Sequence, residues 1–145
     1  MLRVIAGLAA LAVCTTLVLA QNTAAIEQRK QAMKALGGAA KDPGAMAKGD
    51  APFDAAKVQA SLKTIQETAN KAKGLFPDDS KAGDTDALPV AFENKSDLAA
   101  KFDKMAADAK AAAAAIKDEA TFKSEWPKVT ASCGGCHKVY RKPKT

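Results

Sequence analysis

The sequence has few of the residues from which most metal and nucleic-acid sites are built. It contains one histidine, one tryptophan and one tyrosine in 145 residues, and aromatic residues make up 5% of the chain. A single histidine excludes a metal site built from several imidazoles. So few aromatic side chains offer no platform on which bases could stack, so we expect no nucleic acid partner. Runs of β-branched residues are absent and alanine is abundant, which favours helices over strands.

Long hydrophobic runs are absent except at the N-terminus. Met1-Leu2-Arg3 starts the chain with a positive charge, and an apolar run follows from Val4 to Ala20. This order is typical of a secretory signal peptide, so we predict cleavage after Ala20 and one mature domain over residues 21–145. The alternative is an uncleaved anchor, because about 17 apolar residues lie at the short limit of a membrane span. Cleavage would leave no stable membrane anchor.

The charge of the mature chain is modest. Cleavage removes Arg3 from the 22 basic residues, which leaves 21 basic against 16 acidic residues and a net charge near +5. The lysines are scattered among acidic residues along helical faces, so we interpret them as a solvated surface. Such a surface has a weak preference for acidic partners.

The sequence Cys133-Gly134-Gly135-Cys136-His137 lies eight residues before the C-terminus. C-x-x-C-H is the attachment signature of c-type haem. On a helix these three side chains fall at i, i+3 and i+4 and project from one face, so two thiols can bond the porphyrin while the imidazole reaches the iron. We therefore predict one haem c, attached through Cys133 and Cys136, with His137 as the iron ligand.

Two other sites use C-x-x-C. A dithiol redox pair normally opens a helix after a strand, and we predict no strands in this chain. A zinc ion needs four ligands, whereas the mature chain offers only the three cysteine and histidine side chains of the motif. We expect the third cysteine, Cys14, to be removed with the signal peptide; Val13 stands where a lipoprotein would have a small residue.

Apolar residues recur every three or four positions in four segments of the mature chain, which predicts four helices. The first begins near Thr23, is interrupted at the glycine pair 37–38, and kinks or ends at Asp42-Pro43-Gly44. The second starts after Asp54, with the apolar positions Ala55, Val58, Leu62, Ile65, Ala69 and Ala72. The third begins near Ser96, with Leu98, Phe102, Met105, Ala109, Ala112 and Ile116 on its apolar face.

The fourth helix follows Asp118 and carries the motif. Its apolar stripe includes both cysteines: Phe122, Trp126, Val129, Cys133, Cys136 and Tyr140. The cysteines thus share a face with core aromatic residues, so we expect the haem to insert into the bundle. Short links between the first two and the last two helices favour antiparallel neighbours. The longer stretch over residues 75–95 is expected to cross one end.

These segments together resemble the class II cytochromes c, the family of cytochrome c′ and its low-spin relative cytochrome c-556. The resemblance rests on C-x-x-C-H-x-x-Y-R at residues 133–141, on R-x-x-x-M-K-x-L-G-G at residues 29–38, and on residues 51–56 and 75–77. It implies an all-α, antiparallel up-down-up-down four-helix bundle with covalently bound haem c, located in the periplasm. The chain departs from the family at Phe92 and Leu98, where tryptophan and phenylalanine are usual.

The resemblance also implies roles for three basic residues. Arg29 corresponds to the family residue that pairs a haem propionate, and Lys30 beside it either assists a propionate or is a solvated lysine. Arg141 corresponds to a basic residue beside the proximal histidine; the alternative is a solvated C-terminal arginine. A homodimer through the first two helices is a further feature that the family often shows.

Met33, one turn after Arg29, separates two functions within the family. If its thioether binds the iron, the haem is six-coordinate and low-spin, and the protein is a pure electron carrier. If it only packs, the haem is five-coordinate with an apolar pocket that admits NO or CO. We favour the second interpretation. The sequence does not identify the redox partner. We expect no enzyme activity, because the first helix offers no distal acid or base.

Overall fold

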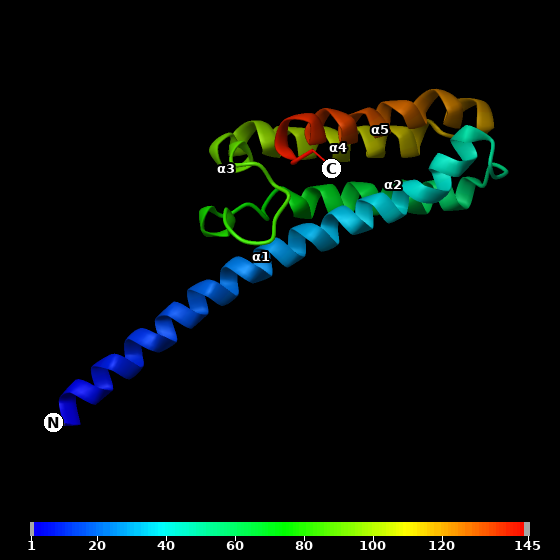
Figure 1. Cartoon of the computed structure of the whole chain (residues 1–145). Coiled ribbons are helices and arrows are strands. Elements are labelled where there is room, and N and C mark those ends of the chain that lie inside the picture. Colours follow the sequence, from blue (N-terminus) through cyan, green and yellow to red (C-terminus); the bar gives the residue numbers. More distant parts are fainter. Residues whose placement is uncertain (1, 144–145) are drawn as a thin grey trace.

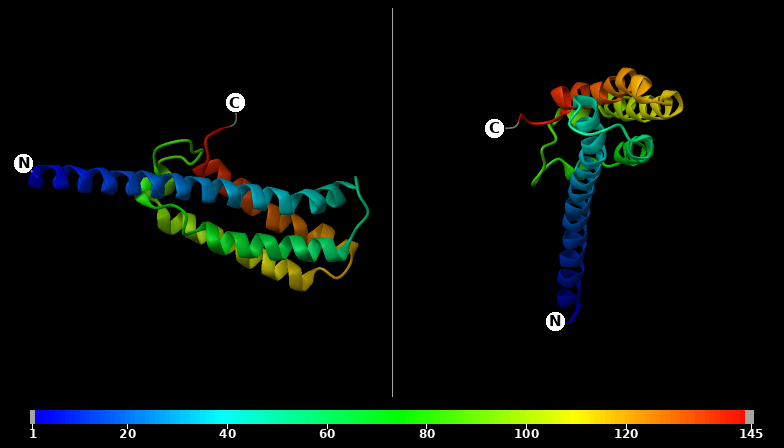
Figure 2. Two further views of the ribbon diagram at one scale, coloured as in Figure 1. Left: turned by 90° about the horizontal axis from the view of Figure 1, so that it is seen from below. Right: turned by 90° about the vertical axis from the view of Figure 1, so that its right-hand side faces the viewer.

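The computed structural model of the chain describes residues 23–143 in full and, for residues 2–22, the backbone alone. Four long helices form a bundle: α1 (Leu2–Lys48), α2 (Ala55–Ala72), α4 (Lys95–Ala115) and α5 (Glu119–Tyr140). They run alternately up and down (Figures 1 and 2). The short helices η1 (Asp78–Ser80) and α3 (Val90–Glu93) lie in the long connection from α2 to α4. The predicted all-α four-helix bundle is confirmed.

Side-chain caps explain where α2 and α5 begin. The Asp54 carboxylate accepts a 3.0 Å hydrogen bond from the backbone N–H of Lys57, three residues into the helix. At α5, the Asp118 carboxylate accepts from the backbone N–H of Thr121 (2.8 Å), and the Thr121 hydroxyl accepts from that of Asp118 (3.0 Å). These bonds satisfy N–H groups that the first helical turn leaves unpaired. Both starts agree with the prediction.

The first helix differs from the prediction. It does not begin at Thr23, and it continues through the glycine pair 37–38 and through Pro43 to Lys48. Pro43 is fully buried, so its packing in the core offsets the helical hydrogen bond that proline cannot make. The helix ends at Lys48, and the next residue, Gly49, has a φ of +84°, a conformation that favours glycine. Tertiary packing thus overrides the local breaking tendency of these residues.

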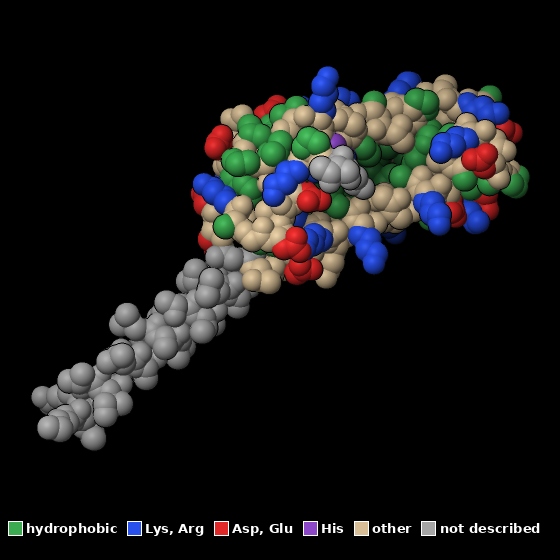
Figure 3. All heavy atoms as spheres, viewed as in Figure 1, with side chains coloured by type: hydrophobic (Ala, Val, Ile, Leu, Met, Phe, Trp, Pro, Cys, Tyr) green, Lys and Arg blue, Asp and Glu red, His purple; other side chains and the backbone are tan. Residues whose placement is uncertain are grey.

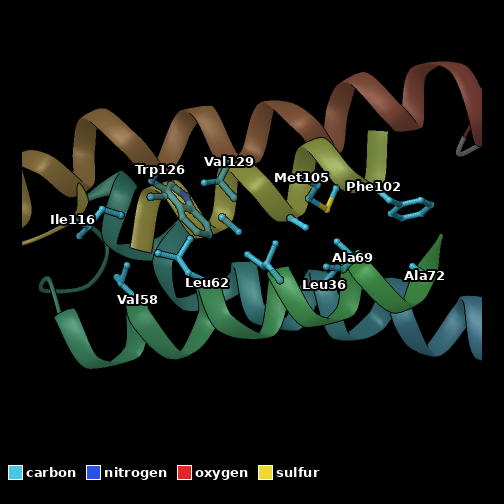
Figure 4. Packing of buried hydrophobic residues seen from close by; sticks show 14 of the residues in the cluster. Leu36, Val58, Leu62, Ala69, Ala72, Phe102, Met105, Ile116, Trp126 and Val129 are labelled. Atoms are coloured by element: carbon cyan, nitrogen blue, oxygen red, sulfur yellow. The ribbon is translucent and has the colours of Figure 1, made fainter. Parts of the chain in front are cut away.

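The apolar stripes of α2, α4 and α5 form the core as predicted, with three exceptions. Ala55 at the start of α2 is exposed, and Cys133 and Cys136 are half-buried. Figure 4 shows Leu62, Trp126 and Val129 converging between the helices. Phe122 is fully buried, and its ring centroid lies 5.4 Å from that of Phe53 and 6.0 Å from that of Trp126.

The predicted signal peptide over residues 1–20, including Cys14, lies outside the fully described part of the chain and stays a prediction. Within residues 23–143, none of the helices is long and apolar enough to cross a membrane.

Candidate functional site

The bundle is open on the side where α1 faces α5. α1 packs mainly on α2, and α5 packs mainly on α4, whereas α1 and α5 contact each other far less. Figure 3 shows a hollow between α1 and α5 that is lined by hydrophobic side chains. Met33 of α1 and the two motif cysteines of α5 are half-buried against the same hydrophobic core. The fold therefore packs these predicted site residues against one apolar core, on the two helices that flank the hollow.

The two motif cysteines lie one helical turn apart and form no disulfide. Burial raises the pKa of both the Cys133 and the Cys136 thiol. A reactive dithiol pair needs a lowered pKa, because the thiolate is the nucleophile. This environment argues against a redox dithiol and fits two thiols that attach a cofactor lying in the hollow.

The remaining residues of the motif agree with this interpretation. A Cβ added to Gly134 or Gly135 would meet no atom within 4 Å, so the backbone beside the cysteines is open to close approach. His137 is half-buried in the last full turn of α5. Among the described residues, no group of three or more histidine, cysteine or acidic side chains could hold a bare metal ion.

Arg141 ends α5, and its environment also fits an added group. It forms an isolated antiparallel bridge with Ala87, and its backbone N–H donates to the His137 carbonyl at 3.2 Å. Its Nε is buried and has no hydrogen-bond acceptor in the described part of the chain. Buried donors in native proteins are normally satisfied, so this one fits an acceptor supplied by a bound cofactor. Its role beside the proximal histidine stays a prediction.

Arg29 is charged and yet almost fully buried, at 5% exposure. Its Nη1 donates to Ser80 Oγ at 2.6 Å and to the Leu75 carbonyl at 2.8 Å. Its Nη2 donates to the Ser80 carbonyl at 2.9 Å and to Thr85 Oγ1 at 3.4 Å. Burial lowers the pKa of the guanidinium. These acceptors explain why an arginine stands on the apolar stripe of α1; pairing with a haem propionate stays a prediction.

Two aromatic rings complete the surroundings of Arg29. Its guanidinium carbon lies 5.2 Å from the ring centroid of Phe76 and 5.3 Å from that of Phe92, within the range of cation–π contacts. Lys30 points elsewhere and pairs with Asp84 at 2.6 Å and with Glu27 at 3.2 Å. Its assistance to a propionate also stays a prediction.

Sequence reasoning missed Ser80 and Thr85, the two hydroxyl acceptors of Arg29. They lie in the stretch rich in aspartate, glycine and proline that we expected to cross one end of the bundle. The available signal was Arg29 itself, because a charged residue on a buried stripe requires acceptors from another part of the chain.

Tyr140 holds the end of α5 against α4. Its side chain is buried, and its hydroxyl donates a hydrogen bond to the Asp97 carboxylate, which also pairs with Lys101 at 3.6 Å. Burial and the neighbouring Asp97 carboxylate raise the pKa of Tyr140 to about 12. The hydroxyl therefore stays protonated at neutral pH and keeps its role as a donor. This contact supports the helical turn that carries Cys136 and His137.

Known proteins share both this sequence and this fold. The family model of Cytochrome C' matches residues 24–141. The chain is 45% identical over 125 residues to cytochrome c' of Rhodopseudomonas palustris, covering 86% of each. It is 38% identical over 120 residues to cytochrome c-556 of Agrobacterium fabrum, covering 82% of each. A solved structure of cytochrome c' from Rhodopseudomonas palustris superposes with a TM-score of 0.81 at 45% identity, covering 83% of this chain and 98% of that one.

The likeness in fold extends to more distant proteins. A nitric oxide complex of a cytochrome c prime variant from Alcaligenes xylosoxidans superposes with a TM-score of 0.73 at 23% identity, over 84% of this chain and 97% of that one. The matches in sequence cover nearly the whole described part of the chain, including the C-x-x-C-H motif and the helix that faces it. This chain belongs to the cytochrome c′ family, whose proteins carry covalently attached haem c.

Proposed function

We propose that this chain is a periplasmic c-type haem protein that binds small uncharged gases such as NO or CO and transfers electrons, with His137 as the one axial ligand from the protein. One observation carries the proposal: Met33 and the motif cysteines are half-buried against the same hydrophobic core, on the two helices α1 and α5 that flank the apolar hollow. When bound, the haem supplies a redox-active iron whose properties the surrounding residues adjust. The nitric oxide complex of the Alcaligenes xylosoxidans protein supports this choice of ligand at the level of the shared fold.

The chain's own residues have separate tasks at this site. Cys133 and Cys136 would hold the porphyrin by covalent bonds, so that it stays in place in both redox states. His137 would donate a ring nitrogen to the iron. The Tyr140–Asp97 hydrogen bond holds the turn of α5 on which His137 stands. Arg141 adds positive charge close to His137.

The distal side favours binding over acid–base catalysis. From Arg29 to Lys41, α1 contains no acidic residue and no histidine. The acids that flank this segment are both paired with lysines, Glu27 with Lys30 at 3.2 Å and Asp42 with Lys57 at 3.7 Å. General acid–base catalysis needs a titratable group within reach of the bound molecule. Proteins of this family are usually binding proteins or electron carriers.

The proposed location rests on the family and on the N-terminal sequence. Proteins of this family are typically secreted to the periplasm. The basic start and apolar run before Gln21 are what a cleavable signal peptide requires.

Met33 supports a second candidate function. Its half-buried side chain stands on the helix that faces the motif. A methionine sulfur is a haem ligand in other cytochromes. A Met33–iron bond would make the protein a low-spin electron carrier, and the 38% identity to a cytochrome c-556 agrees with this alternative.

Optical spectra of the purified holoprotein, reduced and oxidised, with and without CO, test the proposal. We expect a weak, broad ferrous α-band and a spectral change when CO binds. A sharp low-spin band that resists CO would favour the second candidate. Met33→Leu preserves volume and removes the sulfur. If the wild-type haem is five-coordinate, the variant should have the same high-spin spectrum. If Met33 binds the iron in the wild type, the variant should change from a low-spin to a high-spin spectrum. Met46→Leu, at a buried methionine of the same helix, is the matched control.

A further inference from the structure

The loop between α2 and α3, residues 73–89, is bonded to both helices that flank the hollow. It includes η1, and Figure 2 shows it at the end of the bundle where α5 finishes. α1 and α5 contact each other little elsewhere, so this loop is a principal link between them at the haem site.

On the α1 side, the loop is held by Arg29 and by close packing. Four hydrogen bonds run from the guanidinium to Leu75, Ser80 and Thr85, and Ser80 is fully buried. Gly83 lies so close that a Cβ added to it would stand 3.1 Å from Ile26 Cδ1 of α1.

On the α5 side, the loop pairs with the residues that follow the motif. The Leu88 N–H donates to the Tyr140 carbonyl at 2.9 Å, and the Lys142 N–H donates to the Asp86 carbonyl at 2.8 Å. The Lys142 ammonium also donates to the Thr85 carbonyl at 2.7 Å. Thr85 therefore receives bonds from both flanks: its hydroxyl from Arg29 and its carbonyl from Lys142.

The attachment points lie close to the residues that face the iron. Arg29 stands one turn before Met33 on α1, and Arg141, which bridges to Ala87, stands one turn after His137. A loop that is bonded at both places sets how far α1 stands from α5 at this end of the hollow.

We propose that the α2–α3 loop sets the distance between Met33 and His137 and thereby controls access to the distal side of the haem, with Arg29, Ser80 and Thr85 as positioning residues. The proposal rests on the proposed function, because it concerns ligand access to the same site. Loosening the loop lets α1 move outward, so that Met33 screens the distal side less.

Ser80→Ala and Thr85→Val test this in the ferrous holoprotein. Each removes one hydroxyl acceptor of Arg29 and leaves the charge of Arg29 intact. We expect the CO association rate after flash photolysis to rise by about threefold or more in each variant. Thr85→Ser keeps a hydroxyl at this position and should therefore keep the wild-type CO association rate.

Matched controls remove hydroxyls that serve no link across the hollow. Ser124→Ala removes a local bond to the Thr121 carbonyl within α5, and Thr64→Val removes one to the Ala60 carbonyl within α2. Both should keep the wild-type rate even where they shift the unfolding midpoint. All rates are compared at temperatures well below unfolding, so that a general loss of stability does not account for the change.

Unchanged rates in both loop variants would overturn the inference. A CO association rate that changes in Arg29→Lys but in neither loop variant would also overturn the inference, because Arg29 would then act through the haem and not through the loop. The wild-type spectrum tests the proposed function separately. If the wild type has Met33 bound to iron, the proposed gas-binding function fails. The inference about the loop is then tested by a different measurement: the loop variants should contain a smaller fraction of the Met33-bound form than the wild type.

Discussion

The Ser132 hydroxyl donates a 2.8 Å hydrogen bond to the Asp108 carboxylate, and this bond joins α5 to α4 one residue before Cys133. The Lys104 ammonium donates to both oxygens of the same carboxylate, to Oδ1 at 2.9 Å and to Oδ2, which also accepts from Ser132, at 2.7 Å. The helix that carries the haem motif is therefore tied to its neighbour by a polar contact beside the first cysteine and by the Tyr140–Asp97 contact beyond the second.

Ser132→Ala should lower the free energy of unfolding by about 1 kcal/mol, because a hydrogen bond to a half-buried carboxylate is lost. Urea unfolding of the holoprotein measures the difference. Ser124→Ala, whose hydroxyl bonds only within its own helix and is exposed, should cost less. Equal losses in the two variants would mean that the contact between α4 and α5 adds nothing.

The Asp108 contact should also depend on pH. Burial raises the pKa of the Asp108 carboxyl, but the hydrogen bonds from Lys104 and Ser132 lower it by more, and the pKa lies below its ordinary value of 3.8. The bonds therefore stabilise the folded protein above about pH 4, and this contribution is lost as the pH falls through the folded-state pKa.

We accordingly expect the difference in unfolding free energy between wild type and Asp108→Asn to be constant near neutral pH and to shrink below pH 4. Urea unfolding at a series of pH values measures it. Asp103→Asn, at an exposed aspartate paired with Lys73, is the control. A difference that stays the same down to pH 2 would contradict the assignment.

Replacing both motif cysteines should make the cofactor removable. In Cys133→Ala/Cys136→Ala, we expect acidified acetone to separate the haem from the polypeptide, because no covalent bond holds it. The wild-type chain and the exposed-site variant Val139→Ala should retain it. Haem that stays with the double variant would show that another residue attaches it.

Gly83→Ala should destabilise the protein by about 1–3 kcal/mol. Gly83 has a φ of +107°, and the added Cβ would approach Ile26 to 3.1 Å, so strain and crowding act together. Thermal or urea unfolding measures the loss. Gly38→Ala makes an opposite control, since Gly38 lies inside α1 with nothing within 4 Å of an added Cβ, and alanine should stabilise the helix by about 0.5–1 kcal/mol.

Local sequence patterns predicted most of the bundle. Asp54 and Asp118 signal helix starts because a short side-chain oxygen can satisfy unpaired N–H groups in the next turn. The same kind of local argument was wrong for the start of α1 and for the interruption at the glycine pair 37–38, and Pro43 does not end the helix. Pro43 breaks an isolated helix, but burial of its ring against other helices outweighs that cost, and a local pattern contains no information about that packing.

The sequence by itself determined the helices α2, α4 and α5, their buried faces and the C-x-x-C-H motif, because helical periodicity and attachment chemistry depend on residues only a few positions apart. The tertiary structure alone decided what Arg29 binds. Its acceptors at Leu75, Ser80 and Thr85 lie 46, 51 and 56 residues away, in a loop whose own sequence does not show that it pairs with Arg29. The helices bring that loop to Arg29 only when the whole core has packed, and that packing also places Met33 and His137 on two helices beside one apolar hollow.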